Sequence, residues 1–248
     1  MEAFNTKRHS LILFARVFFL ILLFLLAGLC TFFLSERLAP QAVDAAVRPP
    51  LVILDAGHGG EDGGAVGVNG VHEKDINLAV ANELASLLRA AGVEVILTRT
   101  EDKLLYGEDG DIRGERKKND LKNRLAVAEA NPDAIFVSIH MNTFSVAKYS
   151  GLQVYYADTE GSRELANSVQ SSVRGDLQPE NRRVPHAASS SIYLLYHAVG
   201  TSVLVECGFL SNPEECALLS QKDYQSQLCF SIFCGMMEYI ENKGSNMP

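Results

Sequence analysis

The stretch Leu51-Val-Ile-Leu-Asp-Ala-Gly-His-Gly-Gly60 decides the predicted fold of this chain. Its first four residues form a short continuous apolar run, which is typical of a β-strand covered on both faces. A helical stripe of apolar residues follows over 75–91, and Gly92 stands where a left-handed C-terminal cap belongs. The next apolar run, residues 93–97, reads as a second strand. Strands that alternate with helices favour a parallel sheet.

The same alternation continues toward the C-terminus, after a polar loop over residues 100–113. Further strands are expected over residues 134–139, 152–156 and 202–205, and further helices over 115–129, 163–173 and 224–241. We therefore predict an α/β fold with a single domain, in which a mostly parallel, twisted sheet is flanked by helices on both faces.

The N-terminal part of the chain has a different character. Residues 11–34 are almost wholly apolar, and the uncharged part, 17–34, is close to the minimum length of a membrane-spanning helix. Basic residues before this run favour a cytoplasmic N-terminus and export of everything after Leu34. A cleaved secretory signal is the alternative interpretation. In both cases the folded part of the chain is exported.

These observations divide the sequence into five parts. We expect a cytoplasmic N-terminus (1–10), a transmembrane anchor or signal segment (11–34), a linker rich in Ala and Pro (35–50), one core-forming domain (51–242) and a tail (243–248). Residues 1–50 hold five of the 22 Lys and Arg and three of the 30 Asp and Glu, so the remainder has a formal net charge of −10. An acidic balance of this size argues against nucleic acid as a partner.

The five cysteines do not suggest a disulfide framework. Cys30 lies in the N-terminal apolar run, Cys207 follows a predicted strand, and Cys229 and Cys234 do not share a helix face. No Cys-x-x-Cys or Cys/His pair has the spacing of a metal site. We expect buried free thiols.

Three side chains that can bind a metal or a proton stand just past the ends of predicted strands: His58, His140 and Glu206. In an open parallel sheet the carboxyl ends of the strands face one edge, where ligands bind, so these residues can converge. Hydrolytic zinc sites take three protein ligands from His and carboxylates and leave a fourth position for water. A buried Glu206 between Val205 and Cys207 is costly unless it is paired or functional.

The third ligand should come from His72 or Glu73, which precede the helix that starts near Asp75. Spacing alone does not choose between them. A carboxylate at this position could also simply favour the helix dipole.

Other polar features receive weaker interpretations. The glycines of residues 57–64 lack the spacing of a phosphate-binding loop. They are better explained as residues that let the backbone turn tightly and let a bulky substrate approach a metal ion. His186 and His197 are expected not to be ligands. The basic residues of 113–124 alternate with acidic ones, which is typical of a solvated helix face; they are Arg113, Arg116, Lys117, Lys118, Lys122 and Arg124.

Four ordered blocks resemble the signature of a known family: Leu54-Asp-Ala-Gly-His-Gly-Gly-Glu-Asp-Gly-Gly64, His72-Glu-Lys-Asp75, Ser138-Ile-His-Met-Asn142 and Val205-Glu-Cys-Gly-Phe-Leu-Ser-Asn-Pro-Glu214. The family is that of the zinc-dependent N-acetylmuramoyl-L-alanine amidases (Amidase_3), which cut the amide bond between N-acetylmuramic acid and L-alanine in peptidoglycan. The resemblance covers about residues 51–242. It implies one Zn²⁺ ion with His58, Glu73 and His140 as ligands, and Glu206 as the catalytic carboxylate.

Within this family the chain is similar to the spore-cortex, germination-specific amidases of endospore formers (CwlD type), because it combines one N-terminal apolar segment with no wall-binding module. That similarity implies a membrane-anchored or secreted enzyme outside the cytoplasm, in the forespore intermembrane space, that prepares muramic lactam in the cortex. The chain departs from the family pattern at Gly200-Thr201, where a proline is common, and at Cys207, where a small aliphatic residue is usual.

Two rival functions stay open at this point. One is a zinc peptidase that cuts within the stem peptide, and the other is a non-catalytic peptidoglycan-binding relative. Because an unregulated wall hydrolase is dangerous to its cell, an activating or regulatory protein partner is also expected.

Overall fold

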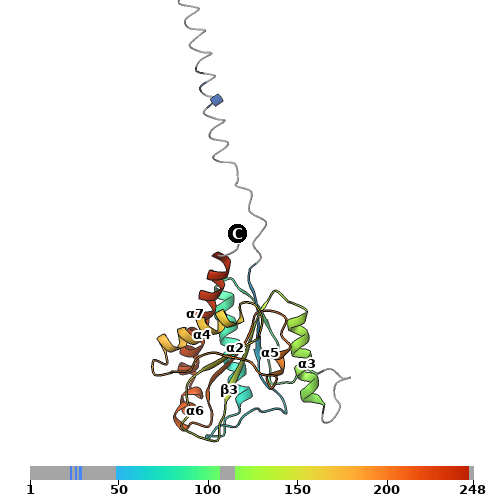
Figure 1. Ribbon diagram of the computed structural model, residues 1–248, viewed down its shortest axis with the longest axis vertical. Helices are drawn as coiled ribbons and strands as arrows, with labels where there is room; N and C mark the ends of the chain where they lie inside the picture. Colours follow the sequence, from blue (N-terminus) through green and yellow to red (C-terminus); the bar gives the residue numbers. More distant parts are fainter. Residues whose placement is uncertain (1–22, 24–25, 27, 30–48, 107–114, 246–248) are drawn as a thin grey trace, which may run out of the picture. The chain divides into compact units, whose positions relative to one another are not determined.

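A computed structural model describes residues 49–106 and 115–245, together with residues 23, 26, 28 and 29 (Figure 1). The chain divides into two units, Met1–Arg48 and Pro49–Pro248, and the strands and helices described below belong to the second. The predicted N-terminus, most of the predicted anchor and linker, and the last three residues lie outside the described part. Within that part, no helix has both the length and the apolar character needed to cross a membrane.

A six-stranded sheet forms the centre of the second unit. Its strands are β1 (Leu51–Ala56), β2 (Glu94–Leu97), β3 (Ile135–Asn142), β4 (Gln153–Tyr156), β5 (His186–Ala187) and β6 (Ser202–Phe209). They lie side by side in the order β2-β1-β3-β6-β4-β5. All neighbours run parallel except β4 and β6. The exception follows from the connection between β3 and β4, which joins the two strands without a helical crossover.

Helices cover both faces of the sheet, as the sequence predicts (Figure 1). One face carries α2 (Glu73–Ala90), α4 (Ser162–Asp176) and α7 (Lys222–Ser245), and the other carries α3 (Arg116–Glu129) and the short α5 (Tyr193–Tyr196). A further short helix, α6 (Pro213–Leu219), follows β6. The prediction of an α/β sheet between two helical layers is confirmed.

Helix α2 shows why the sequence forms these elements. Its buried residues Ile76, Val80, Leu84 and Leu88 recur every four positions and face the sheet. Acidic residues occupy its first turn, where they complement the helix dipole. The helix ends before Gly92, which has a φ of 82° and so takes the left-handed conformation expected of it.

Three short elements were not predicted from the sequence. Strand β5 has two residues and α5 has four, too few for any periodicity to develop. Helix α6 had a readable signal, because Pro213 occupies its first turn and the side chain of Asn212 accepts hydrogen bonds from the backbone N–H groups of Glu214 and Glu215.

The cysteines behave as the sequence predicts in the described part of the chain. Cys207, Cys216 and Cys229 are buried free thiols, and Cys234 is a partly buried one. Cys207, which departs from the family pattern, packs within the apolar core between the sheet and α2, α4 and α7.

Candidate metal centre

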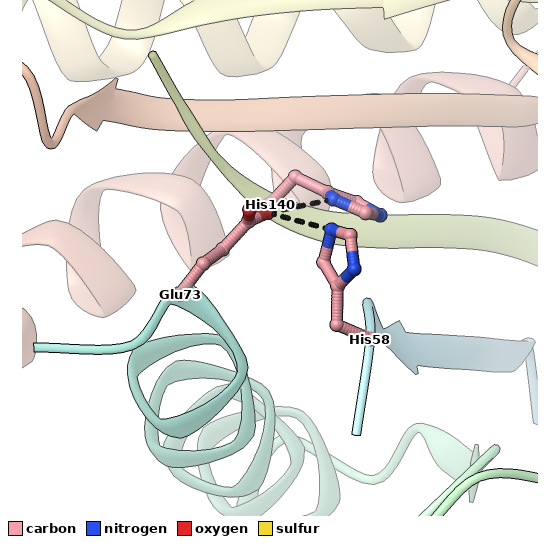
Figure 2. Close-up of side chains that lie close together, drawn as sticks. All are labelled: His58, Glu73 and His140. Carbon is pink, nitrogen blue, oxygen red and sulfur yellow. Dashed lines mark hydrogen bonds and ion pairs between the residues drawn. The ribbon is translucent and has the colours of Figure 1, made fainter. Parts of the chain in front are cut away.

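Three side chains from separate elements meet at the carboxyl edge of β1 and β3 (Figure 2). His58 follows β1, Glu73 begins α2, and His140 lies in β3. Glu73 Oε1 is 2.9 Å from His140 Nδ1 and 3.2 Å from His58 Nε2. One potential ligand atom from each residue lies within 4.8 Å of the other two, so the group could hold a metal ion.

The structure places Glu73, rather than His72, in this group. His72 is an exposed residue at the N-cap of α2. Glu73 is only 3% exposed, and backbone donors fix its carboxylate, since Oε1 accepts from Met141 N at 3.1 Å and Oε2 from Ala65 N at 2.8 Å. Burial alone would raise the pKa of Glu73, but hydrogen bonds from His140 and His58 outweigh it and hold that pKa far below the usual range. The carboxylate is therefore ionised.

The donor set and the space around it fit a zinc ion. Two imidazoles and one carboxylate are typical ligands of hydrolytic zinc. Glycines allow the surrounding backbone to come close: a Cβ at Gly57 would lie 2.2 Å from His140 Nε2, and one at Gly64 would lie 2.5 Å from Glu73 Oε2. These two glycines therefore make room for the side chains of His140 and Glu73.

His58 is held in an unusual backbone conformation. Its φ of 61° is the one positive value at a non-glycine residue in the described part of the chain, a conformation that costs about 1 to 3 kcal/mol and persists where the surroundings fix it. Its Nδ1 is 2.9 Å from Asp62 Oδ2, and its carbonyl oxygen accepts a hydrogen bond from Arg124 Nη2 at 2.7 Å. Burial would lower the pKa of His58, but Asp62 and Glu73 outweigh it and raise that pKa to about 9.

Glu206 lies beside the three side chains, on the neighbouring strand. It pairs in register with His140 of β3 and with Gln153 of β4, so these residues share one face of the sheet. Glu206 Oε2 is shielded from solvent and has no hydrogen-bond partner among the described residues. Burial raises the pKa of Glu206 to about 7, while the charges of His140 and His58 partly offset the effect. A carboxyl group with such a pKa can both accept and donate a proton near neutral pH.

The positions of His140 and Glu206 correct one prediction. Both were expected just past strand ends, yet β3 continues to Asn142 and β6 to Phe209. The reason is that the backbone pairing between β3 and β6 does not stop where the apolar run stops, since it continues through His140 and Glu206 to the pair Asn142–Phe209 after a bulge.

A buried ionic network supports the loop that carries His58, and it corrects a second prediction. Arg124 was assigned to a solvated helix face, but it is 1% exposed and its Nη1 contacts Asp55 Oδ1 at 2.6 Å. Its Nε contacts Asp120 Oδ2 at 2.7 Å. Ser138 and Thr98 donate to the remaining positions of the Asp55 carboxylate, which is fully buried. Burial would raise the pKa of Asp55, but Arg124 and these hydroxyls outweigh it and lower that pKa.

The other candidate residues lie apart from the metal centre or on its rim. His186 lies in β5, and the ring of His197 packs against Tyr193 and Tyr196. Lys118 and Lys122 are exposed, as the solvated-face interpretation predicts, and Arg113 lies outside the described residues. Two members of the basic cluster reach the loop after His58, in ion pairs between Arg116 and Glu61 and between Lys117 and Asp62.

Comparisons with known proteins agree with this geometry. A family model described as N-acetylmuramoyl-L-alanine amidase matches residues 52–238. The germination-specific N-acetylmuramoyl-L-alanine amidase of Bacillus subtilis (strain 168) is 35% identical over 195 residues, which cover 78% of this chain and 81% of that protein. The N-acetylmuramoyl-L-alanine amidase LytC of the same organism is 30% identical and matches over 83% of this chain and 38% of its own length.

Solved structures show the same relationship. The CwlD amidase from Clostridioides difficile, solved in complex with the GerS lipoprotein, has a TM-score of 0.74 and 39% identity, and the match covers 78% of this chain and 99% of that one. AmiC2 of Nostoc punctiforme has a TM-score of 0.67 and 31% identity, with 77% and 97% of the two chains covered. The chain therefore belongs to the N-acetylmuramoyl-L-alanine amidase family and is a hydrolase of that class.

Proposed function

We propose that this amidase is zinc-dependent, with one Zn²⁺ ion held by His58, Glu73 and His140, and that Glu206 is its catalytic acid and base. The observation that carries the proposal is the approach of three potential ligand atoms to within 4.8 Å of one another, from three elements separated in sequence. The substrate is the amide bond that joins N-acetylmuramic acid to L-alanine in peptidoglycan.

The protein residues divide the work of hydrolysis between them. When bound, the zinc ion supplies a Lewis acid for the water and the carbonyl group of the scissile amide. Glu206 takes a proton from the attacking water and delivers it to the leaving nitrogen of L-alanine, a role that its pKa of about 7 suits. The backbone N–H groups of Met141 and Ala65 keep Glu73 oriented toward the ion.

The experiment is digestion of isolated peptidoglycan by the full-length chain with added zinc, followed by mass spectrometry of the products. An amidase frees peptides that begin with L-alanine, a stem peptidase cuts within the peptide, and a binding relative releases nothing. Glu206→Gln should retain zinc and lose hydrolysis by about 10² to 10⁴, whereas His140→Ala should lose zinc. Full hydrolysis by Glu206→Gln would remove Glu206 from the mechanism.

We further propose that the physiological substrate is the spore cortex and that the reaction leads to muramic lactam. The similarity to a germination-specific amidase supports this proposal. The chain should restore muramic lactam in a spore former that lacks its own germination-specific amidase. Restored hydrolysis of vegetative wall without muramic lactam in the spores would contradict the cortex assignment.

The same reasoning extends to location and partner. We propose that residues 11–34 anchor an extracytoplasmic catalytic domain and that a lipoprotein partner controls it. The related CwlD amidase from Clostridioides difficile was solved in complex with the GerS lipoprotein, which supports the second proposal. Activity that an added lipoprotein partner leaves unchanged would contradict it, and loss of membrane association after deletion of residues 11–34 would support the anchor.

A further inference from the structure

Near the carboxyl end of β6, a half-buried arginine lies over two aromatic rings. The guanidinium carbon of Arg183 is 4.5 Å from the ring centroid of Phe209 and 5.9 Å from that of Tyr149. Its Nε donates to the carbonyl oxygen of Ser150 at 2.9 Å. Its terminal nitrogens, Nη1 and Nη2, have no acceptor or ion-pair partner among the residues that the structure describes.

This arginine lies at the same edge of the sheet as the metal centre. Phe209 ends β6, three residues after Glu206, and pairs in register with Asn142 at the end of β3. Tyr149 belongs to the loop that leaves β3 just after His140. Gln153 links the two places, because it pairs in register with Glu206 and its Nε2 donates to the carbonyl oxygen of Val184, the residue after Arg183.

The arginine borders open space rather than protein. A cleft of about 690 Å³ has Tyr149 and Arg183 in its lining. Three carboxylates also line the cleft, those of Glu180, Glu214 and Glu215. Glu180 pairs with Arg182, and Glu215 accepts hydrogen bonds from the backbone N–H groups of Gly151 and Phe209 at 2.8 and 2.7 Å. None of these carboxylates is in ion-pair contact with Arg183, so within the described part of the chain its terminal nitrogens remain available to a ligand.

We propose that Arg183, supported by Tyr149 and Phe209, forms a subsite that binds a carboxylate of the peptide stem during hydrolysis. This proposal rests on the proposed function and assigns the recognition of the leaving peptide. A guanidinium already fixed through Nε and an aromatic face presents its remaining donors as a fork that matches a carboxylate. The domain after residue 50 carries a net charge of −10, so an acidic stem needs a local cation to approach this edge.

Two substrates that differ only in charge test the subsite. One is N-acetylmuramoyl-L-alanyl-D-glutamate, and the other is its diamide, in which both carboxylates are carboxamides. The full-length chain should prefer the acid. Arg183→Gln should lower kcat/KM for the acid by about tenfold or more and leave the diamide within about twofold, which removes the preference.

Two further variants separate recognition from general charge and from folding. Arg163→Gln removes the same charge from an exposed arginine that also lies over an aromatic ring, that of Tyr156 at 5.5 Å, but that does not line this cleft, and it should keep the preference for the acid. Arg183→Lys keeps the charge and a long apolar stem but loses the fork, and should give an intermediate preference. An equal loss on both substrates in Arg183→Gln, or an equal effect of Arg163→Gln, would overturn the subsite.

Binding measurements distinguish failure of the subsite from failure of the proposed amidase. Zinc-loaded Glu206→Gln protein can be titrated with the acid substrate by calorimetry, with and without Arg183→Gln. Binding weakened about tenfold by Arg183→Gln supports the subsite, whether or not the wild-type chain hydrolyses the substrate. Binding that Arg183→Gln leaves unchanged overturns it, even where hydrolysis is normal.

Discussion

The two faces of the central sheet are made by the same strands but differ in the side chains that they carry. Toward α2, α4 and α7, every second residue is apolar and almost fully buried; these include Val52, Leu54, Val137, Ile139, Val203 and Val205. Toward α3 and α5, the earlier positions of the strands are apolar (Ile53, Phe136 and Leu204), and the later ones are polar or charged: Asp55, Ser138, His140 and Glu206. The apolar face needs no specific partners, whereas each buried charge on the other face needs one.

The difference teaches where stability and function reside in this fold. The apolar face stabilises the fold by hydrophobic burial, which is non-directional and independent of pH. The polar face and the adjoining start of α2 place Asp55, Glu73, His140 and Glu206 near one another, and complete sets of donors fix Asp55 and Glu73. Glu206 alone among these four keeps a buried oxygen without a partner in the described structure. We therefore expect substitutions on the two faces to have different signatures.

The largest effect is expected from Arg124→Met, which breaks the network on the polar face. Removing one partner of a buried ion pair leaves Asp55 uncompensated and costs about 3 to 5 kcal/mol. The same change removes the hydrogen bond to the carbonyl of His58, so zinc affinity should fall about 10- to 100-fold. Urea unfolding of the metal-free chain and competition with a chelator measure the two effects.

The control for Arg124 is Arg174, a second arginine that donates to two backbone carbonyls, those of Asn181 and Arg183. It lies in α4, on the apolar side of the sheet. Arg174→Met should lower stability and leave zinc affinity unchanged. If both variants weakened zinc binding equally, the effect of Arg124 would be a general loss of structure rather than the positioning of His58.

A smaller effect on stability, with none on the metal, is expected from Leu84→Ala on the apolar face. Leu84 is fully buried in α2, and the truncation should cost about 2 to 4 kcal/mol through lost burial and a residual cavity. Because α2 keeps Glu73 at its other end, zinc affinity should stay within about threefold of the wild type. A large drop in zinc affinity would show that the two faces are coupled.

The apolar face could be read from the sequence, because its signal is periodic and local. The stripe of α2 and its cap at Gly92 follow directly from spacing. The convergence of His58, His140 and Glu206 could also be predicted, since parallel strands bring their carboxyl ends to one edge. What spacing could not decide was the choice between His72 and Glu73, because backbone donors of Ala65 and Met141 fix that carboxylate.

The polar face hides its partners from a linear reading. Arg124 belongs to an evenly charged helix, and its main partner, Asp55, lies 69 residues earlier. The usable signal was Asp55 itself, a carboxylate at the end of an apolar strand that requires a buried cation. Register also mattered, since the pairing of Glu206 with His140 depends on which strands are neighbours.

Glu206→Gln should stabilise the metal-free chain, with the opposite sign to the other substitutions. The pKa of Glu206 is about 4.3 in the unfolded chain and about 7 in the folded one. The folded chain therefore becomes less stable as the pH rises between those values. A glutamine at this position carries no such penalty, so the gain should be about 2 kcal/mol greater at pH 8 than at pH 5, allowing for the partial exposure of the residue. Unfolding curves at the two pH values measure the difference, and an equal gain at both would mean that Glu206 titrates normally.

The smallest effect is expected from Lys117→Ala, at the exposed end of the contact between α3 and the His58 loop. Lys117 Nζ is 3.1 Å from Asp62 Oδ2, but its side chain is 63% exposed, so the pair should contribute less than about 1 kcal/mol to stability. Asp62 keeps its contact with His58 Nδ1 in this variant, and zinc affinity should change less than about threefold. Both cations reach the same loop from the same helix. Any difference between Lys117→Ala and Arg124→Met in stability and zinc affinity can therefore be attributed to the burial of Arg124. A loss of zinc affinity as large as that of Arg124→Met would place control of His58 at the surface end of α3 instead.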